Sequence, residues 1–268
     1  MTDQATPAAT AIGRGPRFPS TLAPPAYYNG LEDRLRQTLL PVLEPYFSSA
    51  PSPLRILELA SGTGSHSILL AATYGDRIES VQPTECDEYG RERIDRAVTD
   101  ATTGQNTQQG GQGESKVKRA KRLDVMNGQD WKALATSAAA AAAAGEEAGD
   151  EYDLVFGSNF LHMIPFPEGP RQIFSNLVSL NLVCGPTSRL ILYGPFRPSM
   201  RDFFSPSDEK FDQEIGSRPL PASEIPYRLG LRPLDELFAV AEECGWRLEA
   251  QHKVEANGNW VLVFQPSL

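Results

Sequence analysis

The chain has 268 residues, of which 40% are hydrophobic, so it is long enough to form a sizeable buried core. Its formal net charge of -9 opposes non-specific attraction to nucleic-acid phosphates or anionic membranes. No run is apolar over the length of a membrane span, and the first residues lack the basic start and apolar centre of a secretory signal. We therefore expect a cytoplasmic protein with no nucleic-acid or membrane partner.

Three segments have compositions that do not favour a packed core. Residues 1–26 are rich in Pro, Ala and Thr, which predicts a disordered lead-in to a single domain over residues 27–268. Low-complexity insertions are expected near residues 101–116 and 137–151. The first is polar and glycine-rich. The second is an alanine tract, either solvent-exposed and disordered or a frayed helix extending from Trp131.

Apolar residues recur at helical intervals from Leu31 to Phe47, where we expect Pro41 and Pro45 to break or end the helix. Strand-like runs then alternate with helical patterns, which predicts a parallel sheet with helices on both faces. The runs are RILELA, RIESVQP, KRLDV, DLVFGSN and RLILYG, and the helical patterns are SILLAATYG, EYGRERIDRAV, WKALATS, RQIFSNLVSLNLV and LDELFAVAEECG.

The last two strand-like runs, RLEAQHKV and WVLVF, flank an Asn257-Gly258 pair, which is a hairpin signal. The predicted fold is therefore α/β, a doubly wound and mostly parallel seven-stranded sheet with a C-terminal antiparallel hairpin. Cys86, Cys184 and Cys244 are an odd number of widely spaced cysteines, which predicts buried apolar side chains rather than a disulfide framework or a metal site.

A small-residue turn follows the first predicted strand, at the sheet edge where doubly wound folds bind ligands. Gly62 and Gly64 let backbone N–H groups and the next helix approach a polar or anionic group closely. The dinucleotide fingerprint fails because Ser67 stands where its third glycine belongs, which disfavours a nicotinamide cofactor. The residues predicted to contact a cofactor here are Glu58, Ala60, Ser61, Gly62, Thr63, Gly64 and His66.

Carboxylates follow the next two predicted strands. Glu85 lies 21 residues after Gly64 and is predicted to accept hydrogen bonds from ribose hydroxyls, the alternative being a solvated loop acid. Asp124, followed by Val125, is predicted to accept a hydrogen bond from an adenine amino group, the alternative being a helix N-cap or turn residue. Both residues are therefore candidate cofactor ligands.

The order of these motifs resembles that of the methyltransferase-like 26 family over about residues 28–264. The motifs that carry the resemblance are ILELASGTGSH, QPTECD, LDV, DLVFGSNFLHMIPF, LILYGPF, FDQEI, YRLGLRPLDEL and ANGNWVLVF. The resemblance implies a class I methyltransferase fold with S-adenosylmethionine as cofactor and an undefined methyl acceptor. This sequence reads Tyr28-Asn29 where the family usually has Arg-Asn, and Glu85 where an Asp is more usual.

Methyl transfer from a sulfonium needs an aligned acceptor and, for some acceptors, a base. Asn159 and His162 follow the fourth strand and can face one side of a helical turn. His162 is the candidate base because its unperturbed pKa of ~6.5 suits proton removal near neutrality, the alternative being a packed or loop-anchoring histidine. Asn159 would orient the substrate or the methionyl part of the cofactor. Tyr193 would contact the sulfonium or the acceptor, or pack in the core.

The segment from Arg197 to Leu231 is too long for a simple connection and is typical of a lid, the alternative being a solvated loop with aromatic anchors. His66 is predicted to make a structural or cofactor-side hydrogen bond, and His252 to be an ordinary strand residue. The predicted substrate-pocket residues are Tyr28, Asn29, Phe196, Phe203, Phe204, Phe211, Asp212, Arg218 and Arg228.

The leading functional hypothesis is an S-adenosylmethionine-dependent methyltransferase that acts on a small molecule, since aromatic pocket residues suit an apolar or planar acceptor. The alternatives are a protein or peptide methyltransferase, a cofactor-binding protein without transfer activity, and a nicotinamide-dependent oxidoreductase. The low-complexity insertions suggest a eukaryotic source and a role in specialised metabolism.

Overall fold

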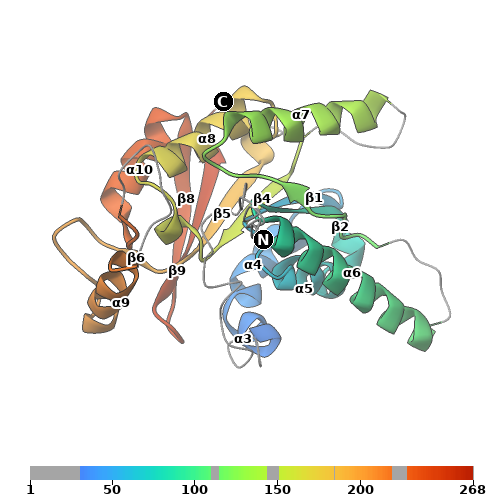
Figure 1. The fold of residues 1–268 in the computed structure, drawn as a ribbon, viewed down its shortest axis with the longest axis horizontal. Helices are drawn as coiled ribbons and strands as arrows, with labels where there is room; N and C mark the ends of the chain where they lie inside the picture. The colour runs from blue at the N-terminus through green and yellow to red at the C-terminus, as the bar shows by residue number, and fades with distance from the viewer. Residues whose placement is uncertain (1–30, 110–114, 144–150, 184, 219–227, 268) are drawn as a thin grey trace, which may run out of the picture.

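A seven-stranded sheet forms the centre of the protein (Figure 1). The computed structural model describes residues 31–109, 115–143, 151–183, 185–218 and 228–267. The strands are β1 (Leu54–Leu59), β2 (Ile78–Glu85), β3 (Lys121–Arg122), β4 (Leu154–Ser158), β5 (Arg189–Gly194), β8 (Trp246–Val254) and β9 (Asn259–Pro266). Their order is β3-β2-β1-β4-β5-β9-β8, with β9 antiparallel to both its neighbours and the other pairs parallel. This topology confirms the predicted fold class.

Helices cover both faces of the sheet (Figure 1). They are α3 (Leu31–Thr38), α4 (Leu40–Ser48), α5 (Ser65–Thr73), α6 (Glu88–Gln109), α7 (Gly128–Ala143), α8 (Glu168–Ser179), α9 (Pro206–Gly216) and α10 (Leu234–Glu243). Short 3-10 turns are η1 (Gly75–Arg77), η2 (Leu161–Met163) and η3 (Gly185–Thr187). A second sheet pairs β6 (Phe196–Arg197) with β7 (Arg232–Pro233) in parallel. This small sheet and α9 belong to the segment predicted as a lid.

Two apolar clusters pack on opposite faces of the sheet. Leu43 of α4 and Leu70 of α5 join Ile56 and Phe156 on one face. On the other face, α7, α8 and α10 contribute a cluster whose members include Trp131, Phe174, Leu237, Leu57 and Val155. Successive residues of a strand point to opposite faces, so strands covered on both sides are apolar almost throughout. The packing therefore fixes the carboxyl ends of β1, β2, β4 and β5 at one edge.

One of the two prolines near the start behaves as predicted. The helical pattern breaks at Leu39, and Pro41 lies in the first turn of α4, where its missing N–H costs no helical hydrogen bond. The prediction for Pro45 was wrong, because Pro45 lies inside α4. The fully buried side chains of Leu43 and Phe47 anchor that helix on both sides of Pro45. Their burial offsets the lost backbone hydrogen bond.

Two helices extend into the segments predicted as insertions. Helix α6 runs through Gln109, so residues 101–109 are helical. Helix α7 runs through Ala143, which matches the helical alternative for the alanine tract. Strand β3 is shorter than predicted and ends at Arg122, so Asp124 lies two residues beyond it.

The two cysteines that the structure describes are less buried than predicted. Cys86 and Cys244 are free thiols and only partly buried, because each lies at the end of an element close to the surface. Cys184 and residues 1–26 lie outside the described residues. Within the described part of the chain, no helix is long and apolar enough to cross a bilayer.

Candidate active site

The turn after β1 is built by left-handed backbone at its glycines. Gly62 has φ 59° and Gly64 has φ 76°, values that favour glycine. A Cβ on Gly64 would lie 3.1 Å from the side chain of Ile94, so the turn also packs closely against α6. The Ser61 N–H donates to the carbonyl of Thr84 at 2.8 Å. The turn is thereby tied to the carboxyl end of β2.

Glu58 at the end of β1 faces the first turn of α5. It is 1% exposed and accepts a hydrogen bond from the Ser67 hydroxyl, while its other carboxylate oxygen lies 3.3 Å from His66 Nδ1. The His66 ring lies 5.5 Å from the ring of Phe156 on β4. His66 Nε2 is buried without a hydrogen-bond partner, a state that costs free energy. His66 Nε2 is therefore free to hydrogen-bond a ligand.

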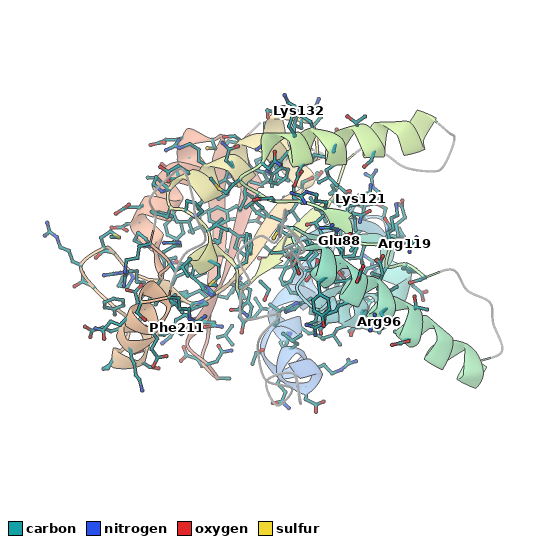
Figure 2. The ribbon with its side chains drawn as sticks, viewed as in Figure 1. Glu88, Arg96, Arg119, Lys121, Lys132 and Phe211 are labelled. Carbon is teal, nitrogen blue, oxygen red and sulfur yellow. The ribbon has the colours of Figure 1, made fainter. Side chains whose placement is uncertain are left out.

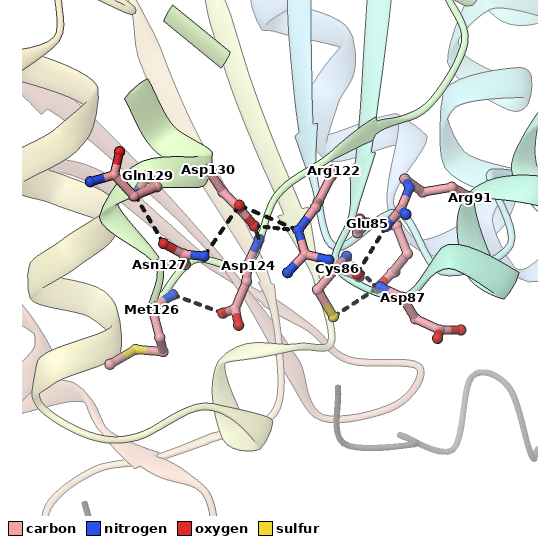
Figure 3. A network of polar contacts seen from close by, with 10 residues as sticks. All are labelled: Glu85, Cys86, Asp87, Arg91, Arg122, Asp124, Met126, Asn127, Gln129 and Asp130. Carbon is pink, nitrogen blue, oxygen red and sulfur yellow. Dashed lines mark hydrogen bonds and ion pairs between the residues drawn. The ribbon is translucent and has the colours of Figure 1, made fainter. Parts of the chain in front are cut away.

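Glu85 at the end of β2 connects two strand ends. Its Oε2 accepts a hydrogen bond from the Gly62 N–H at 3.0 Å, and its Oε1 accepts one from the Cys86 N–H at 2.9 Å. A Cβ on Gly90 would lie 2.7 Å from Glu85 Cγ, so the glycine lets α6 start beside this carboxylate. Figure 3 shows Glu85 and Asp124 at neighbouring positions of the same polar network. The carboxylate is therefore oriented by backbone donors.

Asp124 and Val125 form the turn between β3 and α7. Asp124 Oδ1 accepts a hydrogen bond from the Met126 N–H at 3.0 Å, and its own N–H donates to Asp130 at 2.9 Å (Figure 3). Val125 is buried, and its carbonyl accepts a hydrogen bond from Trp131 Nε1 at 3.0 Å. These contacts match the turn-residue alternative for Asp124. A role toward a cofactor stays a prediction.

Asn159 begins the connection after β4 in a left-handed conformation, with φ 54°. Its N–H donates to the carbonyl of Tyr193 at 2.7 Å, and its side chain is exposed. A Cβ on Gly194 would lie 3.4 Å from Asn159 Oδ1. The helical turn η2 starts only after Asn159, so the prediction that Asn159 and His162 share a helical face was wrong. Because Asn159 has a left-handed backbone, it does not continue into the helical turn that begins at Leu161.

His162 lies in η2 and is 9% exposed. Its ring meets the ring of Phe211 edge-on, with centroids 5.5 Å apart. Burial, followed by the positive charges of Arg232 and Arg218, lowers the pKa of His162 to about 3. The expectation of an ordinary histidine pKa was therefore wrong, since the environment disfavours the charged imidazole. At neutral pH His162 is an uncharged and weakly basic side chain.

Tyr193 packs in the apolar cluster on the α4 and α5 face and is 5% exposed. Its hydroxyl accepts a hydrogen bond from Asn257 Nδ2 at 2.7 Å, which fastens the hairpin turn to β5. The contacts match the core-packing alternative for Tyr193. Phe196 is likewise buried in the opposite core cluster rather than exposed to a pocket.

Aromatic side chains gather around the hairpin and the segment after β5. The Phe204 ring lies 5.0 Å from the ring of Trp260, which pairs with Gly194 across β9 and β5. Trp260 Nε1 is the second buried nitrogen without a hydrogen-bond partner among the described residues. The Arg197 guanidinium lies 3.9 Å from the centroid of Phe203. These rings form an aromatic wall near the carboxyl end of β5.

Helix α9 is fastened to the segment before β7 by an ion pair between the buried Asp212 and the exposed Arg228. Asp212 is 3% exposed, and its carboxylate lies 2.8 Å from the Arg228 guanidinium and accepts a hydrogen bond from the Leu231 N–H at 2.7 Å. The predicted pocket residues Asp212 and Arg228 therefore anchor α9. Phe211 of α9 meets the His162 ring edge-on, and the charge of Arg218, two residues beyond α9, contributes to the lowered pKa of His162. Tyr28 and Asn29 lie outside the described residues.

Sequence reasoning missed Arg232, whose guanidinium is buried. It donates to the carbonyls of Leu161 at 2.9 Å, His162 at 3.3 Å and Ile164. The only signal in the sequence was an arginine within the apolar run LGLRPL. His252 lies exposed in β8, as predicted for an ordinary strand residue. The described residues contain no group of three or more His, Cys, Asp or Glu side chains that could hold a metal ion.

Solved structures of similar fold include methyltransferases. An O-methyltransferase family protein from Burkholderia thailandensis is 13% identical with a TM-score of 0.56, covering 90% of this chain and 61% of that chain. Magnesium protoporphyrin IX methyltransferase from Synechocystis, solved with bound SAH, is 16% identical with a TM-score of 0.54, covering 89% of this chain and 84% of that one. A candidate O-methyltransferase from Nostoc punctiforme is 14% identical with a TM-score of 0.62, covering 96% of this chain and 64% of that chain.

At these identities the likeness shows the fold alone. The chain spans less than two thirds of the length of the Burkholderia and Nostoc proteins. A search of proteins with curated descriptions finds no significant match. A family model described as "Protein of unknown function (DUF938)" matches residues 27–266. The chain therefore belongs to the DUF938 family.

Proposed function

We propose that the protein is an S-adenosylmethionine-dependent methyltransferase that acts on a small molecule. The observation that carries this proposal is the Glu85 carboxylate, held by the Gly62 N–H beside the turn after β1. In doubly wound sheets this edge receives the nucleoside part of a cofactor. The proposal extends over residues 27–268 as one domain and places the chain with the methyltransferase-like 26 proteins.

The residues around the turn fit such a cofactor. The left-handed glycines keep side chains away from the space above the turn, as a nucleoside that approaches the backbone requires. Glu85 would bind the ribose hydroxyls, and Asp124 would bind the adenine amino group. The unpartnered Nε2 of His66 would hydrogen-bond the methionyl part, whose amino and carboxylate groups offer both a donor and an acceptor.

The bound cofactor would supply an electrophilic methyl group on a positively charged sulfur. The chain's own residues would align the acceptor and exclude water, which are the main protein contributions to such a displacement. Asn159 and the rings of Phe203, Phe204 and Trp260 lie at the strand ends where the acceptor has to approach. We assign Phe211 and His162 to the α9 side of the space that the acceptor would occupy.

The proposal is tested by titrating S-adenosylmethionine and SAH into the protein in a calorimeter. A methyl-labelled cofactor is then incubated with the protein and a metabolite extract, and products that gain one methyl group are detected by mass. Micromolar binding with labelled products would support the proposal. Binding without any labelled product favours a cofactor-binding protein without transfer activity, and labelled polypeptide favours a protein methyltransferase. Absence of binding would overturn the proposal.

A further inference from the structure

Two buried side-chain nitrogens among the described residues lack a hydrogen-bond partner, and both lie at the carboxyl edge of the sheet. One is His66 Nε2, on α5 directly after the turn that follows β1, and the other is Trp260 Nε1, on β9 opposite Gly194 at the end of β5. Figure 2 shows Glu88 at the start of α6 and Phe211 of α9 to its left. Buried polar groups without a partner are rare and cost free energy, so both nitrogens mark places where we expect a ligand atom.

The other tryptophans of the chain follow the usual rule. Trp131 and Trp246 are fully buried, and each indole nitrogen donates to a backbone carbonyl. Trp131 Nε1 donates to the carbonyl of Val125 at 3.0 Å, and Trp246 Nε1 donates to that of Phe174 at 3.0 Å. Trp260 is half-buried and differs from both, because no protein group accepts its N–H.

The strand register places Trp260 beside the region where the acceptor has to approach. Directly after β4, the Asn159 N–H donates to the carbonyl of Tyr193 on β5. The next residue of β5, Gly194, pairs with Trp260 on β9. The turn after β1 and Trp260 are thus separated by three strand spacings of about 4.8 Å, or roughly 14 Å. Ala60 of that turn and Trp260 also pack against the same core cluster.

A buried arginine fixes the segment that carries the rest of the aromatic wall. Arg197 is 6% exposed, and its guanidinium donates to three backbone carbonyls within residues 199–202. The same guanidinium lies 3.9 Å from the centroid of the Phe203 ring. The next ring, that of Phe204, is 41% exposed and lies 5.0 Å from the Trp260 ring at an interplanar angle of 36°. An exposed aromatic ring is therefore held against the unpartnered indole.

The chemistry of this wall selects its ligand. An indole N–H is a donor only, so the partner that Trp260 lacks is an acceptor atom such as oxygen. Aromatic rings pack favourably against other flat rings in offset or edge-on arrangements. Phe204 is the exposed side chain that packs on the indole, and it has to shift to admit such a ring. A flat molecule that carries an oxygen satisfies both the apolar rings and the N–H.

We infer that the methyl acceptor is a planar aromatic molecule, one oxygen of which accepts a hydrogen bond from Trp260 Nε1 while its ring packs against Phe204. The inference rests on the proposed function and names the substrate class of that site. The oxygen at Trp260 is a carbonyl, hydroxyl or ether oxygen, since each has a lone pair to offer. Trp260 determines which acceptors bind and takes no part in making or breaking bonds.

The first test identifies the acceptor. The full chain is incubated with S-adenosylmethionine labelled in the methyl group and a metabolite extract, and the labelled products are separated and their ultraviolet spectra recorded. Aromatic absorption by the labelled product supports the inference. Labelled products without an aromatic ring overturn the inference and leave the proposed function standing. Absence of any labelled product despite folded protein overturns both.

The second test observes the indole N–H groups in the wild-type chain by NMR. With 15N-labelled tryptophan, the protein gives one indole signal for each of its three tryptophans. When the acceptor from the first test is added to the SAH complex, the signal of Trp260 should shift. The signals of Trp131 and Trp246 should stay, because their N–H groups are already bonded to core carbonyls. A Trp260 signal that stays in place with the acceptor bound overturns the assignment of Trp260.

The third test removes the N–H and keeps an aromatic ring. Trp260→Phe should raise KM for the same acceptor about 3- to 10-fold with a smaller change in kcat, because one neutral hydrogen bond to the substrate is lost. The Kd for SAH, measured by calorimetry, should be unchanged, which shows that the variant is folded. His252→Gln, at an exposed position of the same hairpin, is the control and should leave KM unchanged. Equal KM values for Trp260→Phe and the control would overturn the assignment of Trp260.

Discussion

The side chain of Glu85 and the backbone of Gly62, 23 residues apart, meet in a hydrogen bond of 3.0 Å. This bond joins the end of β2 to the turn after β1, so one carboxylate both braces the turn and faces the space beside it. The hydroxyls of a ribose bound there would donate to the Glu85 carboxylate, which the Gly62 and Cys86 N–H groups already orient. The candidate cofactor site is thus shaped before any ligand enters.

Glu85→Ala is expected to weaken S-adenosylmethionine binding about 10- to 100-fold, since hydrogen bonds to charged groups contribute about 1.5–3 kcal/mol. Calorimetric titration measures the change in Kd. Glu92→Ala on the exposed side of α6 is the control and should leave Kd unchanged. An unaltered Kd in Glu85→Ala would remove the ribose assignment.

Gly64→Ala is expected to lower the free energy of unfolding by about 1–3 kcal/mol, because a Cβ at φ 76° is strained and would press on Ile94. Cofactor affinity should fall together with stability. Urea denaturation and calorimetry measure the two effects. Gly75→Ala is the matched control, because nothing lies within 4 Å of a Cβ there. Comparable losses in both variants would contradict the close packing of the turn.

The buried neutral state of His162 makes stability depend on pH. Its folded-state pKa of about 3 is below the unfolded value of about 6.5, so the unfolded chain binds a proton that the folded chain does not. This contribution is fully present above about pH 6.5 and is lost as pH falls from there toward about pH 3. Between pH 7 and pH 5 the loss should be about 2 kcal/mol.

His162→Gln should remove that part of the pH dependence, since glutamine does not titrate. Urea denaturation of both proteins at several pH values measures the slopes. Parallel slopes for the wild type and the variant would show that His162 is not held neutral. The absolute stability of the variant at neutral pH does not enter this comparison, because only the change with pH is used.

Asp212→Asn is expected to lower the free energy of unfolding by about 1–2 kcal/mol, because the buried carboxylate loses the charge that strengthens its bonds to the Leu231 N–H and to the exposed Arg228 guanidinium. Thermal or urea denaturation measures the loss. Glu214→Gln on the same helix removes an exposed ion pair of 3.9 Å and should change stability by less than about 0.5 kcal/mol. Similar values for the two variants would refute the anchoring role of Asp212.

Much of the fold follows from patterns that are local in the sequence. Five alternations of strand and helix, and the Asn257-Gly258 turn, specify the parallel sheet and its terminal hairpin, because period and turn chemistry depend only on neighbouring residues. The small-residue turn and Glu85 were found in the same way. The prediction for Pro45 failed because the tertiary packing of Leu43 and Phe47, which local helix propensity does not include, outweighs the missing N–H.

The sequence by itself determined which apolar runs form strands, where the glycine turn follows β1, and which acids follow β2 and β3. Only the tertiary structure decided what surrounds His162, because the burial of its ring and the charges of Arg218 and Arg232 come from segments that are distant along the chain. The same holds for Tyr193, whose hydroxyl finds Asn257 only when the hairpin folds back on β5. A side chain's chemistry depends on its neighbours in space, which sequence spacing does not specify.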